Sequence, residues 1–148
     1  MILSKSCVYA IRAALYVTAN GKGSYVSIRE IAEKLDIPFH FLTKILQTLT
    51  ENNLMTSFRG AKGGVALARA EESISLIEIV KAIDGMDIFK ECVLGLPNCG
   101  FDRPCPLHDE MVGVRDQIKQ TFEQTTLGYL AKKTKDNNFR ISALAISA

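Results

Sequence analysis

The sequence predicts a mainly α-helical fold with one small β-hairpin, and three observations support this prediction. Apolar residues recur at helical spacing over most of the 148-residue chain. Two short β-compatible runs flank a glycine-rich turn near the middle of the chain. The composition, 47% hydrophobic and 23% charged, is that of one globular domain that can bury a core, which excludes a disordered chain.

A first helix is expected from about Ser4 to Ala19. The Ser4 side chain can cap the free amides of the first turn. The apolar face of this helix consists of Val8, Ile11, Ala14 and Leu15. The Asn-Gly-Lys-Gly run over 20–23 ends the helix, because glycine and asparagine favour the left-handed conformation at a helix terminus.

Two further helices are predicted in close succession. The second begins after Ser27, which forms a capping-box pattern with Glu30, and it ends near Asp36. Pro38 suits the first turn of the third helix, where a missing N–H is harmless. The apolar stripe of the third helix is Phe39, Leu42, Ile45, Leu46 and Leu49. Two short helices joined by a few residues indicate a helix-turn-helix.

A β-hairpin follows, with strands expected over 54–58 and 65–68 and a basic, glycine-rich tip over 59–64. A second capping box, Ser75 with Glu78, begins another helix, and Gly85 is placed to end it in a left-handed turn.

The rest of the chain divides into three segments. Glycines, prolines and cysteines exclude a regular element over 86–106. A long amphipathic helix is expected over 107–133, and the tail over 134–148 has no clear pattern. The apolar positions of the long helix are Leu107, Met111, Val114, Ile118 and Phe122. The domains expected are therefore 1–85, with the helices and the hairpin, then a cysteine-rich loop, a long helix and a tail.

The order of helix, helix-turn-helix and basic hairpin within 1–85 is the winged helix-turn-helix arrangement, which predicts binding to double-stranded DNA. The third helix fits the major groove, and its positions outside the apolar stripe are His40, Thr43, Lys44 and Gln47. We expect Lys44 to contact phosphate or guanine and the other three to read base edges. In the hairpin tip, Arg59 and Lys62 can reach phosphates or the minor groove, and Arg59 is favoured for insertion into a narrow minor groove.

The distribution of charge supports this interpretation better than the total charge does. The net charge is only +2, but residues 1–69 carry +5 and residues 70–148 carry −3. The alternative is that short capped helices occur in any small helical domain and that Arg59 and Lys62 are solvated turn residues. The basic hairpin, placed directly after the helix pair, favours DNA binding.

Three of the four cysteines, Cys92, Cys99 and Cys105, lie within 14 residues, and His108 follows them. Zinc ribbons and fingers contain closely spaced C-x2-C pairs, and none is present. The spacing therefore favours an iron-sulfur cluster with one unusual or labile ligand, and the imidazole of His108 is near enough along the chain to join the three thiolates. A thiol-disulfide switch, a structural zinc site and inert cysteines remain alternatives, as does a plain surface role for His108. Cys7 is interpreted as a small core residue, with a ligand or redox role across a dimer as the alternative.

The stretches IREIAEKLDIPFHFLTKILQTL and NLMTSFRGAKGGVALAR, followed by the three-cysteine loop, carry a resemblance over about residues 1–130. They resemble the family of bacterial winged-helix regulators that includes the iron-sulfur cluster regulator IscR, the nitric-oxide sensor NsrR and CymR. The resemblance implies a homodimer that pairs through the 107–133 helix and binds a palindromic operator. It also implies a 2Fe-2S or 4Fe-4S cluster on Cys92, Cys99 and Cys105, with His108 matching the histidine of IscR-like members.

The expected function is a DNA-binding transcriptional regulator, with repression favoured, whose operator binding depends on an iron-sulfur cluster that senses iron, oxygen, nitric oxide or redox state. The alternative is a cluster-free regulator switched by thiols or zinc. A metal-binding or redox protein without DNA function is disfavoured by the basic hairpin. No phosphate-binding loop, nucleophile elbow or HExxH motif is present, so an enzyme is not expected.

No apolar run approaches the roughly 18 residues needed to cross a bilayer. The first residues alternate polar and apolar side chains too often for a signal peptide. We therefore expect no membrane association and a cytoplasmic location.

Overall fold

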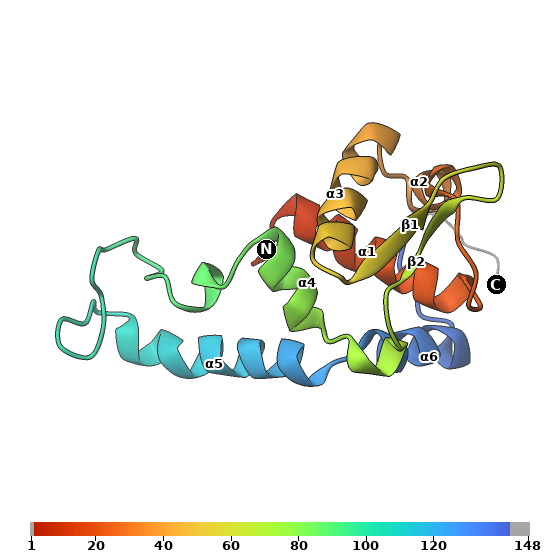
Figure 1. Cartoon of the computed structure of the whole chain (residues 1–148). Coiled ribbons are helices and arrows are strands. Elements are labelled where there is room, and N and C mark those ends of the chain that lie inside the picture. The colour runs from red at the N-terminus through yellow and green to blue at the C-terminus, as the bar shows by residue number, and fades with distance from the viewer. Residues whose placement is uncertain (1, 143–148) are drawn as a thin grey trace.

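The computed structural model describes residues 2–142, which form six α-helices and one two-stranded antiparallel sheet (Figure 1). The expected class, mainly α with a small β-hairpin, is confirmed. The elements are α1 (Lys5–Asn20), α2 (Ile28–Leu35), α3 (Phe39–Glu51), β1 (Met55–Phe58), β2 (Gly64–Leu67), α4 (Leu76–Ile83), α5 (His108–Gln124) and α6 (Leu127–Asn137).

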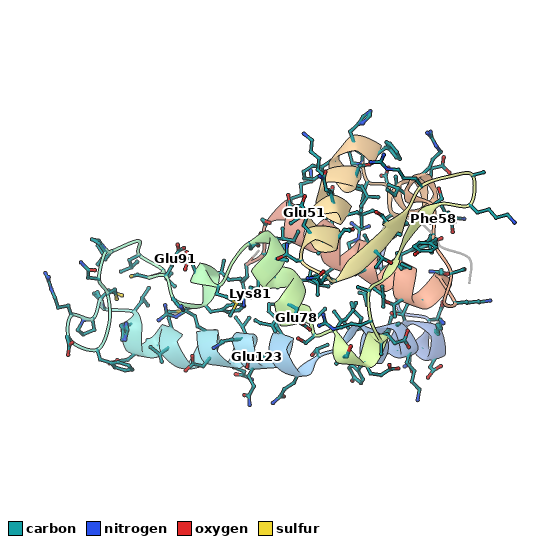
Figure 2. All side chains as sticks on the ribbon, viewed as in Figure 1. Glu51, Phe58, Glu78, Lys81, Glu91 and Glu123 are labelled. Atoms are coloured by element: carbon teal, nitrogen blue, oxygen red, sulfur yellow. The ribbon has the colours of Figure 1, made fainter. Side chains whose placement is uncertain are left out.

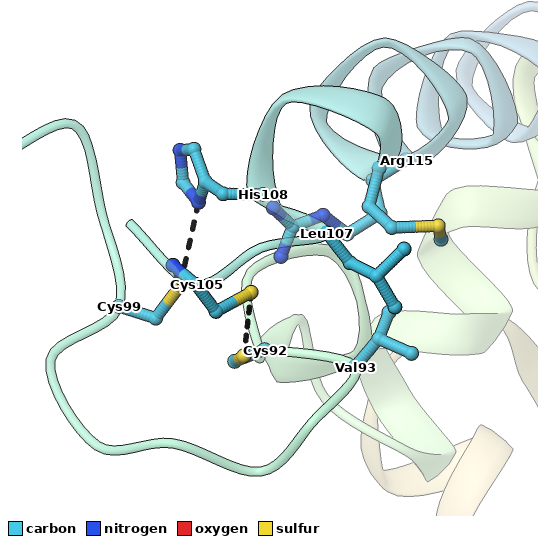
Figure 3. A pocket seen from close by; sticks show the side chains of 8 residues that line it. Cys92, Val93, Cys99, Cys105, Leu107, His108 and Arg115 are labelled. Carbon is cyan, nitrogen blue, oxygen red and sulfur yellow. Dashed lines mark hydrogen bonds between the residues drawn. The ribbon is translucent and has the colours of Figure 1, made fainter. Parts of the chain in front are cut away.

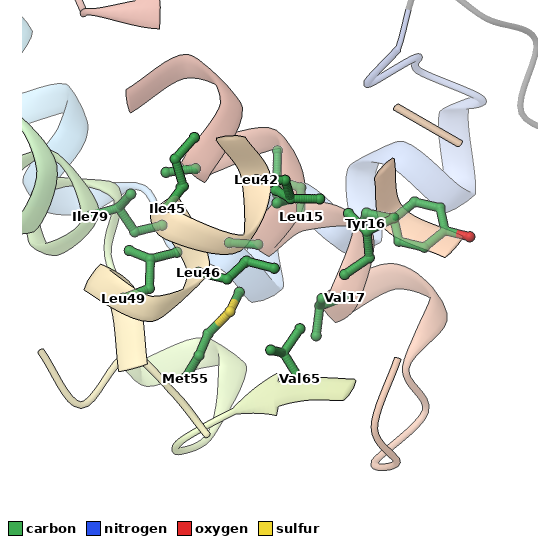
Figure 4. Packing of buried hydrophobic residues seen from close by; sticks show 14 of the residues in the cluster. Leu15, Tyr16, Val17, Leu42, Ile45, Leu46, Leu49, Met55, Val65 and Ile79 are labelled. Carbon is green, nitrogen blue, oxygen red and sulfur yellow. The ribbon is translucent and has the colours of Figure 1, made fainter. Parts of the chain in front are cut away.

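Helix α1 lies at the centre of the main core. It begins as predicted, with the Ser4 hydroxyl accepting a hydrogen bond from the Cys7 amide at 3.1 Å. Three of its alanines, Ala10, Ala13 and Ala14, are buried, and their small side chains let neighbouring helices approach closely. Figure 4 shows the larger side chains of this core, which include Leu15, Leu42, Ile45, Leu46, Leu49, Met55, Val65 and Ile79.

Helices α2 and α3 form the predicted helix-turn-helix. The Ser27 hydroxyl accepts from the Glu30 amide, but the Glu30 carboxylate accepts from the Tyr16 hydroxyl at 2.7 Å instead of completing the capping box. Asp36 ends α2 in the left-handed conformation, with φ at 54°. Pro38 is the N-cap residue of α3, one position before the predicted first turn, and its missing N–H is harmless there as well.

The hairpin has the predicted strands, with Met55 opposite Leu67 and Phe58 opposite Gly64. Only glycine fits at position 64, because the backbone of Val26 approaches closely. A Cβ atom at this position would lie 2.0 Å from the carbonyl oxygen of Val26. That contact belongs to a bridge in which Val26 and Val65 exchange backbone hydrogen bonds of 2.8 and 2.9 Å. The bridge joins the start of β2, next to the hairpin tip, to the loop between α1 and α2.

Helix α4 confirms the second capping box, in which Ser75 and Glu78 satisfy each other's backbone amides. Gly85 follows its C-terminus with φ at +77°, as predicted. A second, smaller core lies between α4 and α5, where Val80, Phe89 and Cys7 pack against side chains of α5. Its aromatic contact is Phe89 against Phe122 of α5, edge to face at 6.2 Å.

The prediction of a single helix over 107–133 is wrong in one respect. The structure has two helices there, α5 and α6, which are separated at Thr125 and Thr126. The Thr126 hydroxyl caps α6 by accepting from the Tyr129 amide. The Thr125 carbonyl accepts from the Leu76 amide at 2.9 Å, and the Leu127 amide donates to the Ile74 carbonyl at 2.9 Å. These backbone groups bond to the segment that begins α4, so they are not available to continue a helix.

Helix α6 packs against α1 and returns the chain to the main core, which includes Leu127 at 1% exposure. The Arg12 Nε group donates to the carbonyl of Ile141 at 2.7 Å and holds the end of the described chain against α1. In the segment over 134–148 that was expected to lack a clear pattern, the residues up to Asn137 belong to α6. Residues 143–148 lie outside the described residues. No helix among the described residues is long and apolar enough to cross a membrane.

Candidate metal centre and nucleic-acid interface

The cysteine-rich loop leaves the body after α4 and meets the N-terminus of α5 (Figure 1). Its turns are short and separate. The Gly95 amide donates to the Cys92 carbonyl at 2.9 Å, and the His108 amide donates to the Cys105 carbonyl at 3.0 Å. These turns fold the loop back on itself, so that residues spaced along it come together beside the first turns of α5.

The structure brings together the three cysteines that the sequence singled out. Their Sγ atoms all lie within 4.8 Å of one another. Cys92 Sγ lies 3.5 Å from Cys105 Sγ, and the Cys105 amide donates to Cys99 Sγ at 3.4 Å. All three are free thiols, with Cys105 buried and the other two half-buried (Figure 3). The grouping can hold a metal centre through sulfur.

His108 joins this group. It is only 6% exposed, and its Nδ1 atom lies 3.4 Å from Cys99 Sγ. Its Nε2 atom is buried and has no hydrogen-bond partner among the described residues. The ring of Phe101 packs against it edge to face at 5.4 Å. A buried imidazole whose polar atoms have no oxygen partner is unlike a surface residue at a helix start, and it suits a metal ligand.

Hydrogen bonds from the local backbone favour the thiolate form of one cysteine, Cys92. Hydrogen bonding to the backbone of Leu96 and then of Leu94 lowers the pKa of Cys92 to about 7, against the effect of burial. At Cys105, by contrast, burial and the neighbouring Cys92 raise the pKa. Because a thiolate is the form that binds metal, Cys92 is the cysteine most readily available as a first ligand near neutral pH.

The donors fit a soft metal centre. A small cavity of about 10 Å³ lies among the cysteines, and the residues around it are Cys92, Val93, Cys99, Cys105, Leu107, His108, Met111 and Arg115 (Figure 3). No carboxylate lines it. Thiolate and imidazole ligands without carboxylates suit iron-sulfur clusters and zinc, and disfavour magnesium or calcium.

Sequence reasoning missed Arg115, which extends from α5 to the loop. Its Nη1 atom donates to the carbonyls of Lys90 at 2.9 Å and Glu91 at 2.7 Å, directly before Cys92. No sequence pattern predicts this contact, because its acceptors are backbone carbonyls that any residues could supply.

The candidate DNA-reading residues lie on α3 and the hairpin tip, on the side of the molecule opposite α5 (Figure 1). His40, Lys44 and Gln47 are exposed. Thr43 is half-buried, and its hydroxyl donates to the Phe39 carbonyl at 2.8 Å. The Gln47 amide donates to Glu51 at 3.3 Å, a surface bond that DNA could replace. Figure 2 shows long side chains projecting from this face into solvent.

The hairpin tip presents Arg59 and Lys62, both exposed. Neither forms an ion pair with any acidic group of residues 2–142. Two further groups on this face were not predicted. The Arg29 guanidinium at the start of α2 lies over the ring of Phe39 at 5.2 Å. The exposed ring of Phe58 packs at 5.5 Å against Tyr25, which supports the hairpin from the α1–α2 loop.

Cys7 stands apart from the metal centre. It is fully buried in the second core, and burial, with the nearby Asp84 carboxylate, raises its pKa to about 12. A thiol that stays protonated in an apolar setting acts as a small hydrophobic side chain. The interpretation of Cys7 as a core residue is confirmed.

Comparisons with known proteins agree with this geometry. Residues 3–133 match the model of the Rrf2 family, described as "Iron-dependent Transcriptional regulator". Protein aau3 of Rhizobium meliloti is 32% identical over 140 residues, which are 94% of this chain and 90% of that protein. The HTH-type transcriptional regulator IscR of Escherichia coli is 28% identical over 130 residues, 88% of this chain and 80% of IscR.

Solved structures show the same fold. The global cysteine regulator CymR of B. subtilis matches with a TM-score of 0.75 at 22% identity, over 89% of this chain and 97% of CymR. IscR of T. potens matches with a TM-score of 0.75 at 22% identity, over 93% of this chain and 91% of that one.

Proposed function

Because the chain belongs to the Rrf2 family of transcriptional regulators, we propose that it binds operator DNA under the control of an iron-sulfur cluster held by Cys92, Cys99, Cys105 and His108. Its relatives are transcriptional regulators and not enzymes. The observation that carries the proposal is the convergence of three free thiols within 4.8 Å beside a buried histidine.

The contacts within the site favour a two-iron cluster. The four side chains form two pairs, Cys92 with Cys105 at 3.5 Å and Cys99 with His108 at 3.4 Å. Two thiolates bound tetrahedrally to one metal at about 2.3 Å lie roughly 3.8 Å apart, so each pair suits one metal centre. A 2Fe-2S cluster takes two protein ligands on each iron, which matches two pairs. When bound, such a cluster supplies one-electron redox chemistry and sensitivity to oxidants and iron supply.

On the DNA face, His40, Thr43 and Gln47 of α3 would read base edges in the major groove, with Lys44 on phosphate or guanine. Arg59 would enter the minor groove, and Lys62 would contact phosphate. The absence of ion pairs at both hairpin cations within the described chain supports this, since no bond to a protein carboxylate must be broken.

A second copy of the chain would complete the regulator. Helix α5 leaves large apolar side chains exposed, with Leu107 at 38% and Val114 at 46%. Pairing through α5 would cover them and would place two copies of α3 on the halves of a palindromic operator. Such a dimer would act in the cytoplasm, where the DNA is.

The cluster would act on DNA binding through α5. His108 is the first residue of α5, so a ligand bond there ties the loop to the helix. The other end of α5 contacts the DNA-binding body through Phe122 and Ile118, which pack against the second core. Binding the cluster would order the loop and fix α5, and thereby the separation of the two α3 helices.

The test is anaerobic purification followed by iron and acid-labile sulfide analysis. We expect two iron and two sulfide per chain, with visible absorption that Cys99→Ala abolishes and operator affinity that changes with it. Cys7→Ala is the matched control, and it should keep the colour because Cys7 lies in the core. Equal operator affinity of the loaded protein and the Cys99→Ala variant would contradict the control of DNA binding by the cluster.

A single zinc ion is the second candidate, because the three thiols also lie close enough to share one metal. A colourless protein that retains stoichiometric zinc, with neither iron nor sulfide after anaerobic reconstitution, would establish it. A protein that holds no metal and forms a disulfide within the loop would instead establish a thiol switch.

A further inference from the structure

Arg115 extends from helix α5 to the cysteine-rich loop. One nitrogen of its guanidinium donates to two successive carbonyls, those of Lys90 and Glu91. These carbonyls directly precede Cys92, so the contact fixes the backbone from which the first cysteine extends. Hydrogen bonds from a charged donor are among the stronger ones in proteins.

The guanidinium also faces the metal centre. Arg115 lines the cavity with the three cysteines (Figure 3), and its Nε atom is buried without a hydrogen-bond partner in the described chain. Leaving a buried N–H of a charged group without an acceptor is costly. Neither ion pair of residues 2–142 involves Arg115. The other lining residues with polar side-chain atoms supply the sulfurs of the three cysteines and of Met111 and the His108 ring, so a sulfur is the natural acceptor for Nε.

The distribution of charge around the cysteines also indicates that Arg115 interacts with their sulfur atoms. Three thiolates in one place repel one another, and a cluster that they hold is anionic. The other cations of this region, Lys90 and Arg103, are exposed to solvent, and neither lines the cavity. The positively charged guanidinium of Arg115 lies beside the cysteines, so it can compensate the negative charge of the thiolates.

We propose that Arg115 is a positioning residue of the cluster site, which holds the Cys92 backbone against α5 and donates its free Nε–H to a sulfur of the bound cluster. The inference rests on the proposed function and adds to it a residue outside the ligand set. Hydrogen bonds to cluster sulfur raise the reduction potential, and partners of metal ligands typically change metal affinity 10–100-fold.

The experiment compares full-length Arg115→Gln with wild type and with Lys119→Gln. The control removes one positive charge from the same helix, at a surface pair with Glu123. We expect Arg115→Gln to lose iron to a chelator at least about 10-fold faster and to shift the reduction potential to a more negative value. Arg115→Lys, which keeps the charge, should recover part of the shift in potential. Wild-type iron release and potential in Arg115→Gln would overturn the proposal.

A measurement on the metal-free protein separates this proposal from the function on which it rests. Hydrogen exchange at the amides of residues 90–93 should be about 10-fold faster in metal-free Arg115→Gln than in metal-free wild type or Lys119→Gln, because the carbonyl contacts are lost. Unchanged exchange would contradict the positioning role. A wild type that never holds a cluster, with exchange still faster in Arg115→Gln, would reject the cluster and the Nε–H bond to it but keep the positioning of Cys92.

Discussion

At the scale of single residues, Cys92 shows how backbone contacts prepare a side chain for chemistry. With its pKa lowered to about 7 by hydrogen bonds to the backbone of Leu96 and Leu94, it becomes a thiolate as the pH rises through neutrality. In the metal-free protein we expect alkylation at Cys92 to accelerate between about pH 6 and pH 8, because the thiolate is the nucleophile. Cys105, with a raised pKa, should react only at higher pH.

Peptide mass spectrometry after brief iodoacetamide treatment at stepwise pH measures both rates. The internal control is Cys7, which should stay unmodified while the protein is folded, because it is fully buried. Identical pH profiles for Cys92 and Cys105 would contradict the unequal preparation of the two thiols.

The contribution of the hairpin tip to DNA binding can be tested at Arg59. Arg59→Ala should weaken operator binding by about 1–3 kcal/mol and reduce its dependence on salt, since a cation that contacts DNA displaces counterions. Fluorescence anisotropy of a labelled operator at several salt concentrations measures both effects. Lys132→Ala, which removes an exposed cation of α6, is the control and should bind as wild type does. Equal losses in the two variants would mean a nonspecific effect of charge.

The sequence predicted the residue types of the candidate metal centre but not all their surroundings. Spacing alone singled out the three cysteines and His108, because ligands of one loop remain close along the chain. The burial of His108 and the contact of Arg115 depend on how the loop folds against α5. Such contacts between an irregular segment and a helix leave no periodic signal in a single sequence.

At the scale of elements, the hairpin depends on the glycine at position 64. Gly64→Ala would place a Cβ atom 2.0 Å from the Val26 carbonyl oxygen and separate the bridge that joins β2 to the α1–α2 loop. We expect a loss of about 3 kcal/mol in the free energy of unfolding, measured by urea denaturation. Gly100→Ala, where a Cβ atom meets nothing within 4 Å, is the control and should change it by less than about 0.5 kcal/mol.

Element boundaries followed the sequence wherever a local signal marks them. The caps at Ser4 and Ser75 and the left-handed Gly85 were predicted because each acts within a few residues of itself. The break between α5 and α6 was not predicted, because it depends on backbone hydrogen bonds to a segment that is distant in sequence, at Ile74 and Leu76. Local preference cannot reveal a helix end that is set by tertiary contact.

At the scale of the whole molecule, α5 should join two copies of the chain. Val114→Glu would bury a charge in the proposed interface, and we expect the dimer to dissociate at least about 10-fold more readily. Operator affinity should fall with it, because two half-sites need two copies. Analytical ultracentrifugation measures the association, and Tyr129→Glu, which changes an exposed aromatic residue on α6, is the control. A Val114→Glu variant that stays dimeric would exclude α5 as the interface.

The return of α6 to the main core has a consequence for how the protein is made. The chain leaves the body after Gly85 and completes its core only when Leu127 docks against it, so the body is discontinuous in sequence. Contacts that close across so long an excursion form late, because the entropy of the intervening chain must be overcome first. During synthesis we therefore expect the body that carries α3 and the hairpin to become stable only after the cysteine-rich loop and α5 have left the ribosome.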